Sequence, residues 1–140
     1  MLFRSGDVVT HSVDLDPGVI LAAIAPWLSD PRIEIGLGGL HMHALGTAGE
    51  LSVLSPVGDT CMVQVNKWDF RWQFGYELKK PVEFFVGEDK LHLECTWDNS
   101  QAHQPYVDGV QQEVRDRNWG HRTSDEMCMG FLYLTGAPAR

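Results

Sequence analysis

The residues of this sequence best suited to chemistry are two histidines separated by a single residue, His41 and His43. In an extended strand the side chains of residues i and i+2 lie on the same side, roughly 6.5–7 Å apart along the chain. Two imidazoles in that arrangement can bind one metal ion, while the intervening Met42 points the opposite way. Because such a pair also arises by chance, two partly exposed strand histidines without a ligand are the alternative interpretation.

A methionine-containing segment near the end of the chain carries the second signal. If it forms a strand, Met127, Met129, Phe131 and Tyr133 share one face, opposite Cys128, Gly130 and Leu132. A methionine on such a face usually packs in the core. As a ligand, however, a neutral thioether is soft and selects Cu(I) over zinc, calcium or magnesium. Two imidazoles and one thioether would therefore suit copper that alternates between Cu(I) and Cu(II).

The elements that must position these side chains are mostly strands. Short apolar runs separated by Gly, Pro, Asn and Asp predict an all-β antiparallel sandwich or barrel. The expected strands cover Val8–Leu15, Ile33–Leu45, Leu51–Leu54, Cys61–Val65, Phe70–Tyr76, Val82–Val86, Leu91–Trp97 and Glu126–Thr135. Between Val86 and Leu91, the turn residues Gly87-Glu88-Asp89 predict a hairpin.

Three further segments complete the expected organisation. Asp16 could cap a helix that begins at Pro17 and runs through Ile24. The polar segment Gln101–Asn118 predicts a long surface loop, with His103 and His121 at its ends as further candidates for contact with metal or substrate. We interpret His11, Trp68, Trp72 and Trp97 as core residues, and Asp125 and Glu126 as structural hydrogen-bonding groups.

Composition limits the classes of partner. The 140 residues, 44% of them hydrophobic, predict one domain spanning residues 1–140. A net charge of −8 without a basic run argues against nucleic acid and anionic membranes as partners. The longest apolar stretch, Val19–Leu28, is about half of a membrane span and contains Pro26. It also lacks the basic flank of a signal peptide, so we expect neither a membrane segment nor an export signal in this chain.

Four motifs together resemble a known family. They occur in the order Gly39–Gly46 (GLHMHALG), Trp68–Gln73 (WDFRWQ), Leu93–Ser100 (LECTWDNS) and Trp119–Cys128 (WG, then TSDEMC). This series resembles the C-terminal catalytic domain of the copper type II, ascorbate-dependent monooxygenases. That family includes peptidylglycine α-hydroxylating monooxygenase and dopamine β-monooxygenase.

The resemblance implies a metal site and its support. His41, His43 and Met127 would be the three ligands of the oxygen-binding copper, and Cys95–Cys128 would be a disulfide beside it. Cys61 would be left as a free, buried thiol. The family fold is a jelly-roll-like sandwich of two antiparallel sheets, in agreement with the strand pattern.

The resemblance also implies a reaction. Copper would activate O2 for C–H hydroxylation of a small-molecule or peptide substrate, with ascorbate as the external reductant. Met129, Phe131 and Tyr133 would be candidates for the substrate pocket. A disulfide together with copper would indicate a secreted or periplasmic protein.

Two departures from the family pattern leave three interpretations open. The family's first domain, which holds a second copper and delivers an electron, has no counterpart here, and Gly39 stands where peptide-hydroxylating members have an arginine. The chain could be the oxygen-activating half of a monooxygenase that works with a separate copper or electron-transfer domain. It could instead be a stand-alone copper-binding or carrier protein. Retention of all three ligand positions disfavours the third interpretation, a sandwich that serves only as an interaction module.

Overall fold

Two antiparallel sheets form the body of the protein. The structure, a computed structural model, describes residues 2–18, 21 and 32–136. Its strands are β1 (Leu2–Phe3), β2 (Val8–Leu15), β3 (Arg32–Met42), β4 (Gly46–Leu54), β5 (Thr60–Val65), β6 (Gly75–Phe85), β7 (Lys90–Asp98), β8 (Tyr106–Val107), β9 (Val110–Gln111), β10 (Arg117–Asn118) and β11 (Cys128–Gly136).

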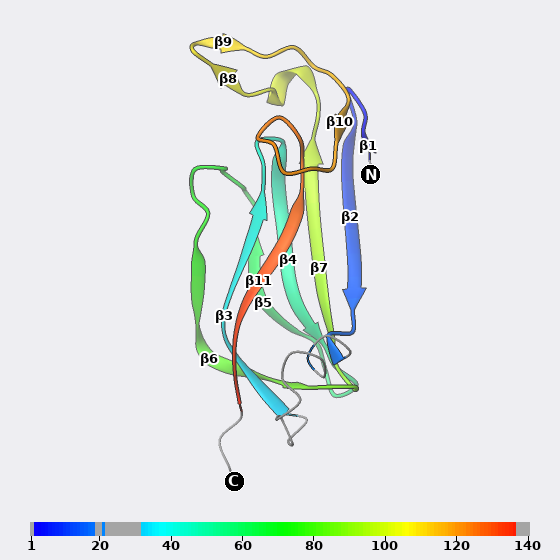
Figure 1. Cartoon of the computed structure of the whole chain (residues 1–140), viewed down its shortest axis with the longest axis vertical. Helices are drawn as coiled ribbons and strands as arrows, with labels where there is room; N and C mark the ends of the chain where they lie inside the picture. Colours follow the sequence, from blue (N-terminus) through cyan, green and yellow to red (C-terminus); the bar gives the residue numbers. More distant parts are fainter. Residues whose placement is uncertain (1, 19–20, 22–31, 137–140) are drawn as a thin grey trace.

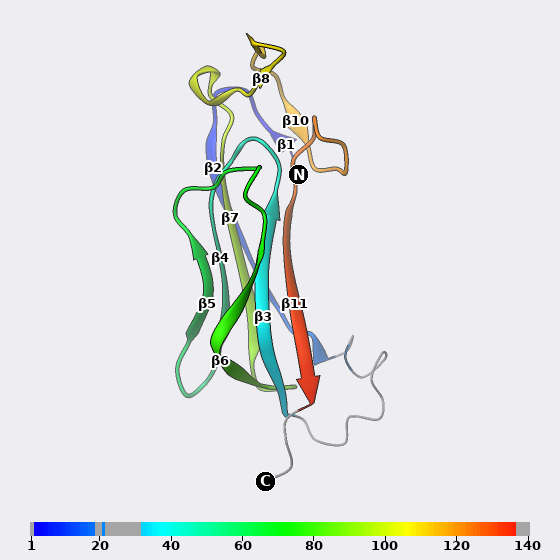
Figure 2. The same ribbon diagram turned by 90° about the vertical axis from the view of Figure 1, so that its left-hand side faces the viewer.

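The strand order explains how the two layers are built. One sheet has the order β2-β7-β4-β5 and the other β11-β3-β6, and every pairing in them is antiparallel. The sheets stand as two layers along the long axis of the molecule (Figures 1 and 2). The predicted fold class, an all-β antiparallel sandwich, is confirmed.

The core follows from strand alternation. Along β7, Leu93, Cys95 and Trp97 turn inward and are at most 8% exposed, as the sequence predicts. One cluster, which includes Leu40, Met42 and Trp97, lies at the end of the sandwich where β3 finishes. A second cluster, which includes Ile33, Ile35 and Phe84, fills the other end. The candidate ligands therefore lie beside a packed core.

The predicted hairpin between Val82–Val86 and Leu91–Trp97 is wrong. The turn itself is present, because Glu88 N and Asp89 N both donate to Phe85 O, and Gly87 adopts a φ of 89°. The two strands that it joins, however, belong to different sheets: β6 pairs with β3, and β7 pairs with β2 and β4. The chain thus crosses from one layer to the other at this turn.

The strand predicted over Phe70–Tyr76 is also wrong, since β6 begins only at Gly75. Local turn bonds hold residues 69–73 instead: Trp72 N donates to Asp69 O, and Asp69 Oδ1 accepts from Arg71 N. Hydrogen bonds from the Arg71 side chain and amide lower the pKa of Asp69 to about 2. Trp72, expected in the core, is 68% exposed on this loop.

The long segment between β7 and β11 is more ordered than a plain loop. It contains a short 3-10 helix (Gln101–His103), the hairpin β8–β9 and strand β10, which pairs with β1. Asp108 and Gly109, at φ values of 50° and 79°, form the turn of the hairpin. The hairpin projects at one end of the molecule (Figure 1).

Three residues predicted for the core and one predicted helix remain to be placed in the fold. Trp68 and Trp97 are buried as predicted, whereas His11, expected in the core, is exposed on the edge strand β2. The predicted helix over Asp16–Ile24 and the apolar stretch Val19–Leu28 lie largely outside the described residues. At its expected start, Asp16 Oδ1 accepts a hydrogen bond of 2.8 Å from Gly18 N. Within the described ranges, no helix has the length and apolar character needed to cross a membrane.

Candidate metal centre

The two histidines lie where β3 ends and β11 begins. Met42 is the last residue of β3, and its Cα pairs with that of Cys128, the first residue of β11. Met129 pairs with His41 in the same register. Because the strands run in opposite directions, Met127 precedes this pairing on the side where His43 follows it. The backbones of His43 and Met127 therefore lie at the same end of the sheet.

The imidazole rings of His41 and His43 lie next to each other at this end, in an edge-to-face arrangement. Their centroids are 5.2 Å apart and the rings are inclined at 84°. His43 is only 5% exposed, while His41 is half-buried. The ring of Phe70, from the loop before β6, lies edge-on 6.1 Å from His43. The rings are thus close enough for both to bind one ion.

Hydrogen bonds determine which ring nitrogen of each histidine is free. His43 Nδ1 donates to the carbonyl oxygen of Asp125 at 2.9 Å, and His41 Nδ1 donates to Gln73 Oε1. The Gln73 amide is oriented by its own Nε2, which donates to Phe70 O at 2.6 Å. Since both acceptors are oxygens without a proton, each Nδ1 carries the hydrogen and each Nε2 keeps its lone pair. Metal-binding histidines have this arrangement.

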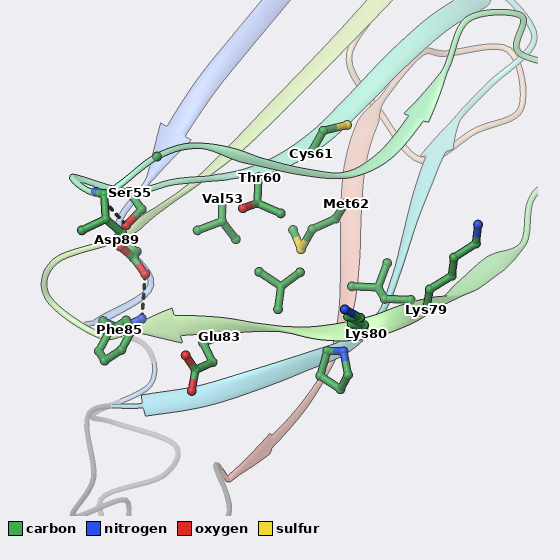
Figure 3. Close-up of a pocket in the computed structure, with 15 residues that line it drawn as sticks. Val53, Ser55, Thr60, Cys61, Met62, Lys79, Lys80, Glu83, Phe85 and Asp89 are labelled. Carbon is green, nitrogen blue, oxygen red and sulfur yellow. Dashed lines mark hydrogen bonds between the residues drawn. The ribbon is translucent and has the colours of Figure 1, made fainter.

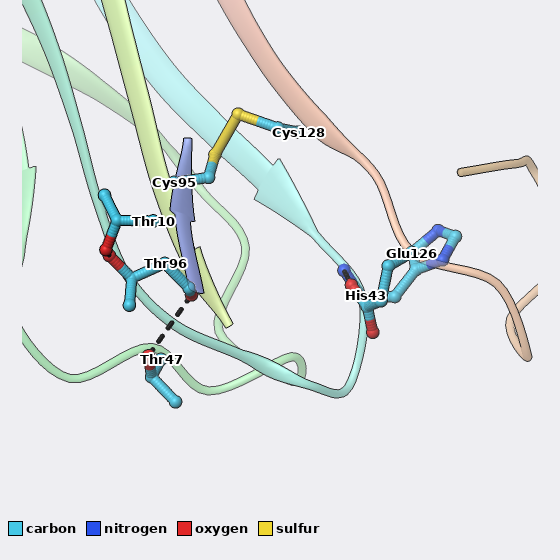
Figure 4. The surroundings of a disulfide bond; sticks show 7 residues. All are labelled: Thr10, His43, Thr47, Cys95, Thr96, Glu126 and Cys128. Carbon is cyan, nitrogen blue, oxygen red and sulfur yellow. Dashed lines mark hydrogen bonds between the residues drawn. A yellow bond between two sulfur atoms is a disulfide. The ribbon is translucent and has the colours of Figure 1, made fainter. Parts of the chain in front are cut away.

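Met127, the third predicted ligand, is a buried methionine at this end of the sheet. It is 3% exposed, and its sequence neighbour Cys128 forms a disulfide with Cys95 of β7. The predicted Cys95–Cys128 pairing is confirmed, and it joins the two sheets at the residue that directly follows Met127 (Figure 4). The expectation that Cys61 is buried is wrong, because its thiol is exposed on β5.

The carboxylate of Glu126 holds the turn after the second histidine. It is 1% exposed, and its two oxygens accept hydrogen bonds from the backbone amides of His43 (3.1 Å) and Leu45 (2.8 Å). Figure 4 shows Glu126 beside His43. Burial raises the pKa of Glu126 to about 7, although the amides of Leu45 and His43 and the nearby Trp97 indole oppose that rise. The structural role expected for Glu126 is confirmed, and Asp125 contributes through its carbonyl oxygen.

The residues named as candidates for a substrate pocket lie on the outer face of the sheet. Met129, Phe131 and Tyr133 are 43%, 39% and 62% exposed. Their strand positions pair with His41, Gly39 and Leu37 of β3. The Phe131 ring lies over Gly39, so that a side chain at position 39 would overlap it. The outer face beside His41 is therefore apolar and open.

The donor types of the predicted set, two imidazoles and one thioether, are types that suit copper. Within the described residues, no group of three or more His, Cys, Asp or Glu side chains is placed to hold a metal ion. The predicted set has two such side chains, and its third donor is a thioether, which favours Cu(I) over hard cations. Of the other histidines, His103 lies in the 3-10 helix near Asp98, and His121 packs against Trp119 at 5.4 Å.

A cavity whose lining contains no histidine lies elsewhere in the sandwich. It has a volume of about 730 Å³ and opens between β5 and β6, lined by residues such as Met62, Leu78 and Lys79 (Figure 3). Asp89 at its edge is already bonded to Phe85 N at 2.8 Å. We assign no chemistry to this cavity, because its charged groups do not converge on one point.

Sequence reasoning missed the two oxygens that orient the imidazoles. Gln73 is the last residue of the WDFRWQ motif, and Asp125 precedes Glu126, but the motif alone does not show that these residues contact His41 and His43.

A search of family models and of curated proteins finds no match to this sequence.

Proposed function

We propose that this chain is a mono-copper domain that binds and activates O2 for C–H hydroxylation with an ascorbate-type reductant. His41, His43 and Met127 are the proposed copper ligands. The observation that carries the proposal is the orientation of the two imidazoles, whose Nδ1 atoms are held by carbonyl oxygens while both Nε2 atoms stay available. The four-motif resemblance supports the same ligand set.

Each protein group has a definite task in this proposal. The Gln73 and Asp125 oxygens fix the ring orientations, and the Glu126 carboxylate fixes the backbone that follows His43. The Cys95–Cys128 bridge anchors the segment that presents Met127. Copper bound there would supply one-electron redox chemistry and oxygen binding. An exposed Met129–Tyr133 face would receive the substrate carbon.

The proposal includes a partner and a compartment. Only one set of copper ligands is proposed, so the second electron would come through a separate copper or electron-transfer domain. The disulfide indicates an oxidising environment. We propose secretion or export to the periplasm on that basis.

A stand-alone copper-binding or carrier role is the second candidate. It is favoured by the burial of two of the three proposed ligands, His43 and Met127, which are 5% and 3% exposed. Burial of this kind protects a bound ion, whereas turnover requires access for substrate. Gly39, covered by Phe131, also departs from the arginine of the peptide-hydroxylating members.

Anaerobic Cu(I) loading tests the ligand set. We expect about one copper per chain, measured by elemental analysis after removal of free metal. His41→Ala and Met127→Ile should lower that stoichiometry sharply. Gln73→Leu should retain binding with roughly 10–100-fold weaker affinity, because the imidazole would lose its orienting acceptor.

Matched variants away from the site serve as controls. His11→Ala, on the edge strand β2, and Met62→Ile remove the same donor types from positions that are not proposed ligands, and should leave one copper per chain. Unchanged stoichiometry in both His41→Ala and Met127→Ile would overturn the assignment.

A further inference from the structure

A second cavity, of about 370 Å³, lies beside the candidate metal centre. Its apolar wall comes from Leu45 after β3, Phe70 before β6, and Pro105, Tyr106 and Val107 at the β8 strand. None of His41, His43 or Met127 lines it. This volume is in the range that accommodates a small organic molecule, and such sites combine apolar walls with a few polar groups.

Two arginines border this cavity. Arg117 is 6% exposed, and its Nη1 donates to the carbonyl oxygen of Ser124 at 2.8 Å. Its Nε is buried and, within the described part of the chain, has no hydrogen-bond acceptor. Arg115 lines the same cavity and is exposed. Burial and the nearby charge of Arg115 lower the pKa of Arg117.

The carboxylates near these arginines are committed to backbone amides. Asp125 Oδ2 accepts from Arg122 N at 3.3 Å, and the Glu126 oxygens accept from His43 N and Leu45 N. Among the described residues, neither Arg115 nor Arg117 is recorded in an ion pair. Asp125 and Glu126 also line the cavity, and their charges act on Arg117 against the effects of burial and Arg115. Neither forms an ion pair with Arg117 among the described residues, and the Arg117 Nε still lacks an acceptor there.

We propose that this cavity binds a small organic carboxylate with an apolar body. The carboxylate would be held by Arg115 and Arg117, since a guanidinium fork matches the geometry of two carboxylate oxygens. The body of the ligand would pack against Phe70, Tyr106 and Val107. The apolar wall favours an organic acid over inorganic phosphate. The inference stands without copper, because the cavity contains no proposed metal ligand.

Calorimetric titration of the metal-free full-length chain tests the ligand class. Phenylacetate should bind with one site per chain. Phenylacetamide, of the same shape but uncharged, and inorganic phosphate, charged but without an apolar body, should each bind at least about tenfold more weakly. Equal binding of phenylacetate and phenylacetamide, or no saturable phenylacetate binding, would overturn the proposal.

Arginine variants test the location. Arg115→Gln and Arg117→Gln should each weaken phenylacetate binding about tenfold, while Arg122→Gln, an exposed loop arginine outside the cavity, should leave it unchanged. Thermal unfolding establishes first that each variant is folded. Should Arg117→Gln fail that check, Arg115→Gln decides, because its side chain is exposed. Unchanged affinity in the folded variants would place the ligand elsewhere.

Amide NMR shifts supply an independent readout. Phenylacetate should shift the Tyr106, Val107 and Leu45 amides, and leave those of Cys61 and Met62, in the other large cavity, unchanged. The reverse pattern would refute the assignment. Copper stoichiometry is measured separately, so failure here and failure of the proposed copper site give different results.

Discussion

Buried polar atoms, rather than the ligands alone, determine what the candidate centre can do. His41 and His43 could be named as candidate metal ligands from their spacing, and Met127 from its motif, because these signals lie within short stretches of sequence. The Gln73 and Asp125 oxygens could not, since each contacts a histidine 32 or 82 residues away in the chain. Tautomer choice is therefore a tertiary property of this fold.

Glu126 should make the stability of the metal-free protein depend on pH. Its ordinary pKa is 4.5 and its folded-state pKa is about 7, so the folded chain binds a proton more tightly than the unfolded chain. The contribution of Glu126 to the free energy of unfolding should therefore be fully present below pH 4.5 and be lost through the window up to about 7. The expected loss from this group is about 3 kcal/mol, measured by urea unfolding at several pH values.

A neutral variant isolates that contribution. Glu126→Gln should flatten the loss between about pH 4.5 and 7, because an amide of the same shape does not titrate. Glu88→Gln, an exposed carboxylate in the β6–β7 turn, is the matched control and should leave the pH profile unchanged. An identical slope in Glu126→Gln and the parent protein would contradict this account.

At the scale of the elements, alternation predicted strands better than it predicted their partners. The range Val8–Leu15 coincides with β2, although β2 is an edge strand in which only Val9 is partly buried. The assignment of β6 and β7 to different sheets depends on packing between the layers. The turn Gly87-Glu88-Asp89 can join two strands of one sheet or two strands of different sheets, so it does not predict which occurs. Conversely, the β8–β9 hairpin, with Asp108-Gly109 at its turn, lies in a segment that was predicted to be a long loop.

The Cys95–Cys128 bridge should contribute substantially to stability. Its cysteines are 33 residues apart, and closing a loop of that length in the unfolded chain corresponds to about 3–4 kcal/mol. The double variant Cys95→Ala, Cys128→Ala should lose that much unfolding free energy in urea denaturation. It should also bind Cu(I) less tightly, since Met127 is adjacent to Cys128.

Cys61→Ser is the control for the bridge. Its thiol is exposed and unpaired, so the substitution should change the free energy of unfolding by less than about 0.5 kcal/mol. A double variant as stable as the parent would show that the bridge does not constrain this fold.

At the scale of the whole molecule, the all-β antiparallel sandwich could be predicted from composition and strand spacing. The 370 Å³ cavity could not, because Arg117 and Leu45 come together only when β10 and the turn after β3 meet. The contact of the Phe131 ring with Gly39 could not be predicted from the sequence either, because the two residues are 92 positions apart in the chain.

Oxygen uptake distinguishes the half-enzyme from the carrier. The copper-loaded chain with ascorbate should consume O2 slowly and release peroxide, because no second copper site is proposed to deliver an electron. A candidate C–H substrate should not couple that uptake to product unless an electron-transfer domain is added. Rapid, fully coupled turnover by the lone chain would contradict the half-enzyme interpretation, and absence of any uptake would favour the carrier.

The bridge beside Met127 also restricts the choice of reducing agent at the bench. Dithiothreitol and other thiols reduce copper, but they also exchange with disulfides, and here the exchange would remove the covalent anchor at the residue next to Met127. Ascorbate donates electrons singly and leaves sulfur–sulfur bonds intact. If the proposed copper site exists, preparations handled in thiol buffers should lose copper as the bridge opens, whereas ascorbate-reduced preparations should retain both the metal and the bridge.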